Sequence, residues 1–339
     1  MLETFISSFQ AMLGLFFYMT IGFLLIKTKI LPENSSKVMA KLLTFVFCPA
    51  LSFTSMAKNF NVESMGKYAS LIILSLIAIS VSIILAIYVA RFFVKDKMNY
   101  ERRVYTYALT FGNYGYVGAP LVIALFGMEG YAFFNFVTLP CTIVIYTWGI
   151  NTLVPKTEKK RTSKETIKSI FNVPTIALLI GMVVGITGLG KILFEYEPLD
   201  FISSSITTLG NCMAPGAMLL AGITVARYDF NKMLKNKKVY VATFLRLVII
   251  PTIIIAVMFL VIKLANLLGL SIDYSFLFLV FFVYATPLGM NTIVFPEAFG
   301  GDASVGASMT LISHVLCVIT IPLLFALLSV IFAPIPVFI

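Results

Sequence analysis

Hydrophobic positions along the chain form long apolar segments separated by short polar ones, and this pattern predicts membrane-spanning helices. Each segment has about 20 or more residues, enough for a helix to cross a hydrocarbon core about 30 Å thick. The composition agrees, because 60% of the residues are hydrophobic and 12% are charged, whereas soluble domains have roughly half and a quarter. The predicted spans are ten, at roughly 5–26, 36–57, 68–90, 104–126, 130–153, 171–194, 199–226, 239–262, 275–297 and 303–333.

Lys and Arg gather in alternate loops, and this alternation predicts the orientation of the chain. Short loops rich in Lys and Arg stay on the cytoplasmic side of a membrane. The even-numbered loops and both termini hold only Lys58, Lys67, Lys191 and Lys263. We therefore expect both termini to be extracytoplasmic. The cations of the odd-numbered loops are Lys27, Lys29, Lys37, Lys41, Arg91, Lys95, Lys97, Arg102, Arg103, Lys156, Lys159, Lys160, Arg161, Lys164, Lys168, Arg227, Lys232, Lys235, Lys237 and Lys238.

Several classes of function lack the residues that they need. The loop pattern accounts for the net charge of +10, so no nucleic-acid partner is indicated. All fifteen Asp and Glu residues lie at span ends or in loops, which argues against a midplane carboxylate that couples protons or sodium. The single His and the separated Cys48, Cys141, Cys212 and Cys317 show no metal-ligand spacing. We expect no cofactor, no metal and no enzymatic activity.

Five spans lie on each side of the central loop, and this arrangement implies two inverted halves. If the first five spans start outside, the next five start in the cytoplasm, so two similar halves have opposite orientations. Inverted repeats are common in secondary transporters. We expect a first five-helix repeat at 1–154, a basic cytoplasmic linker at 155–170 and an inverted second repeat at 171–339.

The fourth span of each half is interrupted by Gly and Pro. These spans read TFGNYGYVGAPLVIALFG and YATPLGMNTIVFPEAFGG. Pro removes a backbone donor and Gly loosens a helix, and the freed polar groups must be buried in protein or line a wet cavity. Interrupted spans at matching positions in the two halves indicate a transporter's binding site. The residues assigned to the helix crossing are Gly118, Pro120, Pro287 and Gly289.

Asn113 and Asn291 lie inside these breaks and are the leading candidates for contact with a substrate. An amide carries two donors and an acceptor, so it can bind either a carboxylate or a cation. Gly112, Gly115 and Thr286 are expected to contribute to the same substrate-binding site. The alternative is that the Gly and Pro residues form structural kinks, which are routine in membrane helices.

Two ionisable residues inside the spans have open interpretations. Arg246 lies eight residues past Lys238, about 12 Å along a helix. Its side chain can reach the cytoplasmic interface by snorkelling, or it can attract or pair with an organic anion in the substrate site. His314, the only histidine, is either an interhelical hydrogen-bonding residue or a proton-sensing group that titrates near neutral pH.

At FGNYGYVGAPL and TPLGMNTIVFPEAFGGD the chain resembles the auxin efflux carrier family, including its bacterial members described as malate or malonate permeases. The resemblance implies an all-α integral membrane fold like that of the bile-acid and Na⁺/H⁺ antiporter transporters, with ten transmembrane helices and broken helices 4 and 9 crossing. It also implies a scaffold of spans 1, 2, 6 and 7, a moving domain of the other six, a homodimer and an elevator-like mechanism. The chain departs from the plant carriers in its short central loop and in a third span without ionisable residues.

Together these features predict a secondary transporter of a small organic anion in the cell (inner or plasma) membrane. The anion is expected to be a mono- or dicarboxylate, auxin-like or malate/malonate-like. Membrane lipids and a second copy of the chain are the other expected partners. Two alternatives stay open, a sodium- or proton-coupled organic-anion symporter and a non-transporting membrane receptor.

Overall fold

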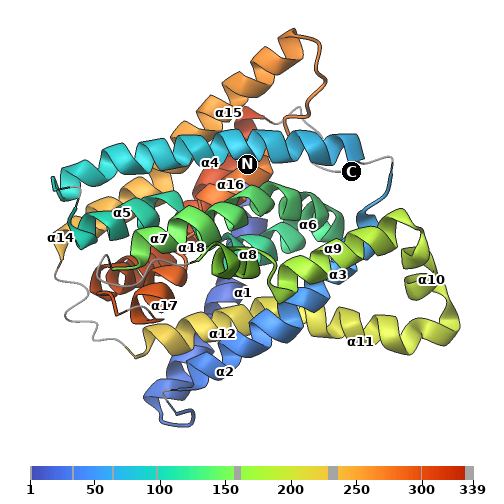
Figure 1. Cartoon of the computed structure of the whole chain (residues 1–339), viewed down its shortest axis with the longest axis horizontal. Coiled ribbons are helices and arrows are strands. Elements are labelled where there is room, and N and C mark those ends of the chain that lie inside the picture. The colour runs from blue at the N-terminus through green and yellow to red at the C-terminus, as the bar shows by residue number, and fades with distance from the viewer. Residues whose placement is uncertain are drawn as a thin grey trace.

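The computed structural model describes residues 2–32, 34–62, 65–96, 98–155, 162–227, 236–298 and 300–332, and within them all regular structure is helical (Figure 1). The longer helices are joined by short loops, and several are interrupted. The α-helices are α1 (Leu2–Lys27), α2 (Ser35–Leu42), α3 (Cys48–Asn59), α4 (Met65–Phe93), α5 (Tyr100–Thr110), α6 (Ala119–Val144), α7 (Ile150–Leu153), α8 (Ser163–Ile170), α9 (Val173–Ile186), α10 (Leu189–Glu195), α11 (Asp200–Asn211), α12 (Met213–Val225), α14 (Lys237–Phe244), α15 (Ile250–Leu267), α16 (Phe276–Tyr284), α17 (Asn291–Ala298) and α18 (Ser304–Ile331).

The described part of the chain has seven helical stretches that are long and apolar enough to cross a membrane. An eighth qualifies if α8 and α9, which are bent by 56° relative to each other, form one span. The protein is therefore an all-α, multi-pass membrane protein. Gly127, with a φ of 67°, breaks α6 inside the 40-residue stretch Tyr114–Leu153. The short helices α5, α16 and α17 lie outside this count, so the number of ten spans stays a prediction.

Two helix pairs pack closely through glycine. α1 lies along α12, and α3 lies along α9. A Cβ atom at Gly222 of α12 would overlap the backbone carbonyl of Met19 in α1, and a Cβ at Gly181 of α9 would overlap that of Phe53 in α3. In a membrane, small residues at helix contacts let the backbones approach and gain dispersion energy. α2, α3, α10, α11 and α12 lie together in the lower half of Figure 1.

α16 is enclosed by its neighbours and anchors the second half. Its sequence FLFLVFFVY is apolar on every face, and all nine residues are buried, as expected for a helix inside a bundle. It packs against α4, α6, α15 and α18. The ring of Phe282 in α16 packs at a tilt against that of Phe325 in α18, with centroids 5.1 Å apart. Because α16 is held on several sides, the backbone that follows Tyr284 starts from a fixed position.

Gly222→Val is expected to lower the melting temperature of the detergent-purified protein. The branched side chain would be forced against the backbone of α1, and overpacking of this kind costs about 1–3 kcal/mol. Gly14→Val on α1 is the matched control, because a Cβ there meets nothing within 4 Å. Equal melting temperatures for the two variants would contradict the close α1–α12 contact.

Candidate functional site

The two interrupted helices meet at their breaks. The segment between α5 and the π-helical turn that precedes α6 lies beside the segment between α16 and α17. Gly112 and Leu288 form an isolated antiparallel bridge. The Asn113 N–H donates to the carbonyl oxygen of Pro287 over 2.7 Å. Each break therefore supplies hydrogen-bond partners for the other, which the interior of a membrane requires of non-helical backbone.

Close packing explains two of the glycines in the first break but not the third. A Cβ atom at Gly112 would overlap Nη2 of Arg246 and Oγ1 of Thr286. A Cβ at Gly118 would come within 2.6 Å of a carbonyl oxygen of α16. At Gly115 an added Cβ would meet nothing within 4 Å. Gly112 and Gly118 thus permit the crossing, whereas Gly115 leaves open space beside it.

Side chains of α18 support the second break. The Ser313 hydroxyl accepts a hydrogen bond from the Leu288 N–H at 3.0 Å. The hydroxyl oxygens of Thr310 and Thr292 lie 3.3 Å apart. Sequence reasoning identified His314 on this helix and missed Ser313 and Thr310. The available signal was their spacing of three and four residues, which places all three on one face of an otherwise apolar helix.

Both the nitrogen and the oxygen of the Asn113 side-chain amide form hydrogen bonds within the protein. Its Nδ2 donates to Nε2 of His314 at 3.2 Å, and its Oδ1 accepts from the Tyr116 N–H at 3.3 Å. Nδ1 of His314 lies 2.8 Å from the carbonyl oxygen of Thr310. These contacts assign the neutral tautomer with the proton on Nδ1. His314 is therefore placed as an interhelical hydrogen-bonding residue that holds Asn113.

A polar cavity of about 270 Å³ lies beside the crossing. Its walls come from the two breaks, from α6 and the turn after it, and from the start of α3, α9 and α12. The predicted site residues Gly112, Asn113, Gly115, Gly289 and Asn291 line it. The predicted residues that do not line it are Thr286, Gly118, Pro120, Pro287, Arg246 and His314.

Sequence reasoning missed most of the polar wall that faces the two breaks. These side chains come from α3, α6, and α9 with its N-cap residue, and they lie outside the two breaks that the sequence marks. They are recognised as part of one site only because the fold brings them to the same cavity. They are Ser52, Asn135, Thr138, Thr142, Asn172 and Thr175.

The cavity is lined by neutral groups. None of the described residues that line it is charged, and its polar side chains are amides, hydroxyls and phenols. Helices begin again at its edge, at Tyr114 and Asn291, and the N-terminal turn of a helix carries a positive partial charge. The N–H groups of Tyr116, Thr292 and Ile293 already donate within the protein. Such a site suits a small anion. The described residues contain no group of three or more His, Cys, Asp or Glu that can hold a metal.

Arg246 does not snorkel to the interface. It is fully buried, with 0% of its surface exposed. Its Nη1 donates to the carbonyl oxygen of Tyr284, the last residue of α16. Nε and Nη2 have no hydrogen-bond partner. The snorkelling expectation was wrong because the side chain turns inward, toward the crossing, and the structure places it against Gly112 rather than in the cavity wall.

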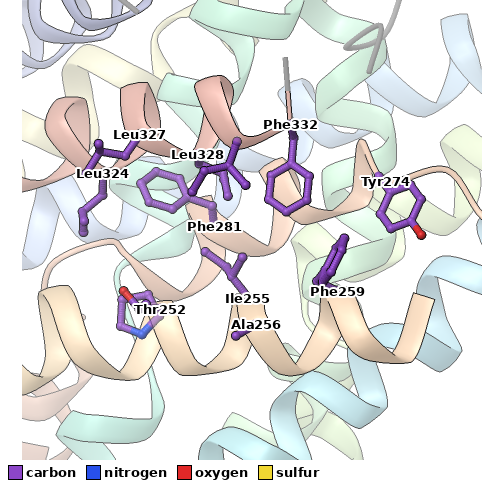
Figure 2. Close-up of a pocket in the computed structure, with 12 residues that line it drawn as sticks. Thr252, Ile255, Ala256, Phe259, Tyr274, Phe281, Leu324, Leu327, Leu328 and Phe332 are labelled. Atoms are coloured by element: carbon purple, nitrogen blue, oxygen red, sulfur yellow. The ribbon is translucent and has the colours of Figure 1, made fainter. Parts of the chain in front are cut away.

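A larger hollow of about 600 Å³ lies between α15 and α18, with Phe281 of α16 between them (Figure 2). Thr252 and Tyr274 are the polar side chains among the residues that line it, and the rest are apolar. Binding sites for polar ligands need convergent polar groups in addition to volume. The smaller cavity at the crossing is therefore the candidate functional site.

Broken helices that meet beside a polar cavity inside an all-α membrane bundle define a transporter-like site. The chain belongs to the membrane transport protein family, whose sequence profile matches residues 7–325. It is similar to Protein PIN-LIKES 2 from Arabidopsis thaliana, with 30% identity over 125 residues. That match covers 36% of this chain and 26% of the plant protein, so the chain spans about a quarter of the relative's length. The resemblance to auxin efflux carriers is confirmed.

Asn113→Ala is expected to lower the melting temperature in detergent, whereas Asn151→Ala is not. The first variant leaves the Tyr116 N–H and His314 Nε2 without their partner, and a buried unpaired group costs about 1–3 kcal/mol. Asn151 is exposed on α7 and bonds only the carbonyl of the preceding turn, at Thr147. An unchanged melting temperature for Asn113→Ala would show that its amide does not hold the crossing together.

Proposed function

We propose that the protein is a secondary transporter of a small organic anion, and that the anion binds in the cavity at the helix crossing. The observation that carries the proposal is the gathering of Asn113, Asn291 and two helix N-termini around one cavity with polar walls. A carboxylate can accept hydrogen bonds from the amides and from the first N–H groups of the resumed helices. The cavity of about 270 Å³ lies just below the usual range of roughly 300–1,000 Å³ for ligand pockets, which suits a small mono- or dicarboxylate.

Asn291 is the better placed of the two amides to bind the ligand. Asn113 uses one donor on His314 and one acceptor position on Tyr116, so it offers the ligand what remains of its amide. Asn291 is less buried than Asn113 and opens α17 at the cavity edge. At Gly115 an added Cβ would meet nothing within 4 Å, so a ligand can approach the backbone there.

The packing of the remaining helices supports two inverted repeats, 1–154 and 171–339, joined by 155–170. The first span (α1) packs on the seventh (α12), and the second (α3) packs on the sixth (α9). In two five-span repeats, span 1 corresponds to span 6 and span 2 to span 7. The pair of spans 1 and 7 therefore corresponds to the pair of spans 6 and 2. Both pairs also rely on glycine at the contact.

The cavity lies between this glycine-packed group and the crossing, which supports an elevator-like mechanism. One wall comes from α3, α9 and α12, and the other from the two breaks and α6. Sliding of the crossing against the glycine-packed group would carry the ligand from one side of the membrane to the other. The resemblance to the auxin efflux carriers also implies a homodimer, and we include a dimer in the same proposal.

A proton-coupled symporter is the second candidate, and one observation favours it. His314 lies directly behind Asn113 and bonds its amide, so a change in its protonation would alter a cavity group. Sodium coupling has no comparable side chain, since none of the described cavity residues is acidic. Membership of a transport family favours both forms over a non-transporting receptor.

Asn291→Ala is expected to reduce transport sharply at limiting substrate concentration. Loss of one polar partner of a buried ligand costs about 1–3 kcal/mol, roughly ten- to a hundredfold in affinity. The measurement is counterflow in proteoliposomes against malate, malonate and indole-3-acetate, with Asn151→Ala as the matched amide control. Replacement of sodium by choline and variation of pH separate a uniporter from the two symporters. Full transport by Asn291→Ala would refute the cavity as the binding site.

The proposed orientation predicts which loops an impermeant thiol reagent reaches in intact cells. In a background without the four native cysteines, Lys191→Cys should react from outside and Lys168→Cys should not. Both residues are exposed, so accessibility depends on the side of the membrane and not on burial. Much of the basic fifth and seventh loops (156–161 and 228–235) lies outside the described residues. If the reagent labels Lys168→Cys and not Lys191→Cys, the chain has the opposite orientation to the one proposed.

A further inference from the structure

Arg246 is a buried cation that the proposed binding of substrate does not use. It lies on the π-helical turn Leu245–Ile249 between α14 and α15, and this turn contacts α5 and α18. The guanidinium is fully buried, and neither Nε nor Nη2 has a hydrogen-bond partner. The titratable side chains closest to it are Tyr284 and Cys141, which are ordinarily uncharged at neutral pH. No anionic side chain of the described chain therefore pairs with this charge.

The backbone around Arg246 supplies the negative potential that side chains do not. α16 ends at Tyr284, whose carbonyl oxygen accepts from Nη1. α5 ends at Thr110, and Nη2 lies against Gly112, two residues further on. The last carbonyl groups of a helix lack intrahelical partners and carry a negative partial charge. Arg246 thus lies where the C-terminal ends of both broken helices converge.

The opposite helix ends face the cavity. The helices resume at Tyr114 and at Asn291, and both residues line the cavity, whereas Arg246 does not. The N-terminal turns carry positive partial charge. A crossing of two broken helices would otherwise present two positive and two negative ends to its surroundings. Because Arg246 lies beside the negative helix ends and offsets their potential, the potential that a ligand meets in the cavity comes from the positive helix ends.

We propose that Arg246 is a built-in counter-cation of the helix crossing, which neutralises the C-terminal ends of α5 and α16 and thereby makes the cavity selective for anions. It acts through the crossing without contacting the ligand, so it is a positioning and specificity-determining residue. The proposal rests on the proposed function for its ligand, but its electrostatic part concerns the protein alone. The two parts can be tested separately.

The first test is thermal melting of detergent-purified protein without any ligand. A buried charge without any compensating interaction is costly, so its replacement by an apolar group of similar size should stabilise the fold. A counter-cation behaves differently, so Arg246→Met should melt below the parent, and Arg246→Lys should recover most of the loss. Arg91→Met, which removes the same charge from the exposed end of α4, should melt like the parent. A melting temperature of Arg246→Met at or above the parent's would overturn the proposal, as would a failure of Arg246→Lys to recover stability.

The second test compares charged and neutral ligands in proteoliposomes. The probes are indole-3-acetate with indole-3-acetamide, and malonate with malonamide. In Arg246→Met the half-saturating concentration for the carboxylate should rise by about tenfold, equivalent to ~1.4 kcal/mol, while inhibition by the amide is unchanged or stronger. Arg246→Lys should retain the preference for the carboxylate. A role that is only structural would weaken the two ligands of a pair equally, and that result would overturn the assignment of specificity.

Failure of the proposed function gives a different pattern from failure of this inference. If the parent protein transports and binds none of the four probes, the anion-transport function is at fault, and ligand-free melting decides the role of Arg246. If the parent transports a carboxylate and Arg246→Met keeps the same preference over the amide, transport stands and the counter-cation does not. A preference that falls in Arg246→Met and returns in Arg246→Lys supports both.

Discussion

The fold depends on the hydrogen bonding of backbone that leaves the helical conformation inside a membrane. Lipid offers no partner to a freed N–H or C=O, so one interrupted helix is costly wherever it is placed. Here the cost is removed by a second interruption at the same place, where Gly112 bridges Leu288 and Asn113 bonds Pro287. The glycines, the buried α16 and the polar face of α18 all serve to bring these two short segments into contact and to keep them there.

Local chemistry is what the sequence predicted well. Long apolar runs, alternating cationic loops and Gly/Pro clusters each depend on neighbours in the chain, so the membrane class and both breaks followed from them. The roles of Asn113 and Asn291 stay predictions. Partners distant in sequence did not follow. The wall formed by Asn135, Thr138 and Asn172 comes from α6 and from the N-cap of α9, and its position opposite the two breaks depends on tertiary packing. The depth of Arg246 along its helix was predictable, but the direction of its side chain depends on packing against α5 and α16.

Selection of an anion need not involve a charged side chain in contact with it. The cavity is lined by neutral groups, and the fully buried guanidinium of Arg246 lies behind the wall at Gly112. A charged residue in direct contact would bind an anion strongly and release it slowly. Under the proposed function, partial charges on the helix N-termini would bind the anion less strongly, while Arg246 neutralises the negative helix ends on the far side of the wall. A transporter benefits from this arrangement because it must both capture and discharge its ligand during each cycle.

The double use of the Asn113 amide links two positions that are distant in the sequence. An aspartate at position 113 has no hydrogen to give to Nε2 of His314, and it would face a lone pair unless the imidazole took up a proton. The acid and the protonated ring would then form a buried ion pair with no net charge. In such a variant, replacement of His314 would leave the aspartate at position 113 without a partner in a low-dielectric interior. The identities at 113 and 314 are therefore thermodynamically coupled, and divergence of one position during evolution constrains which residues the other can accept.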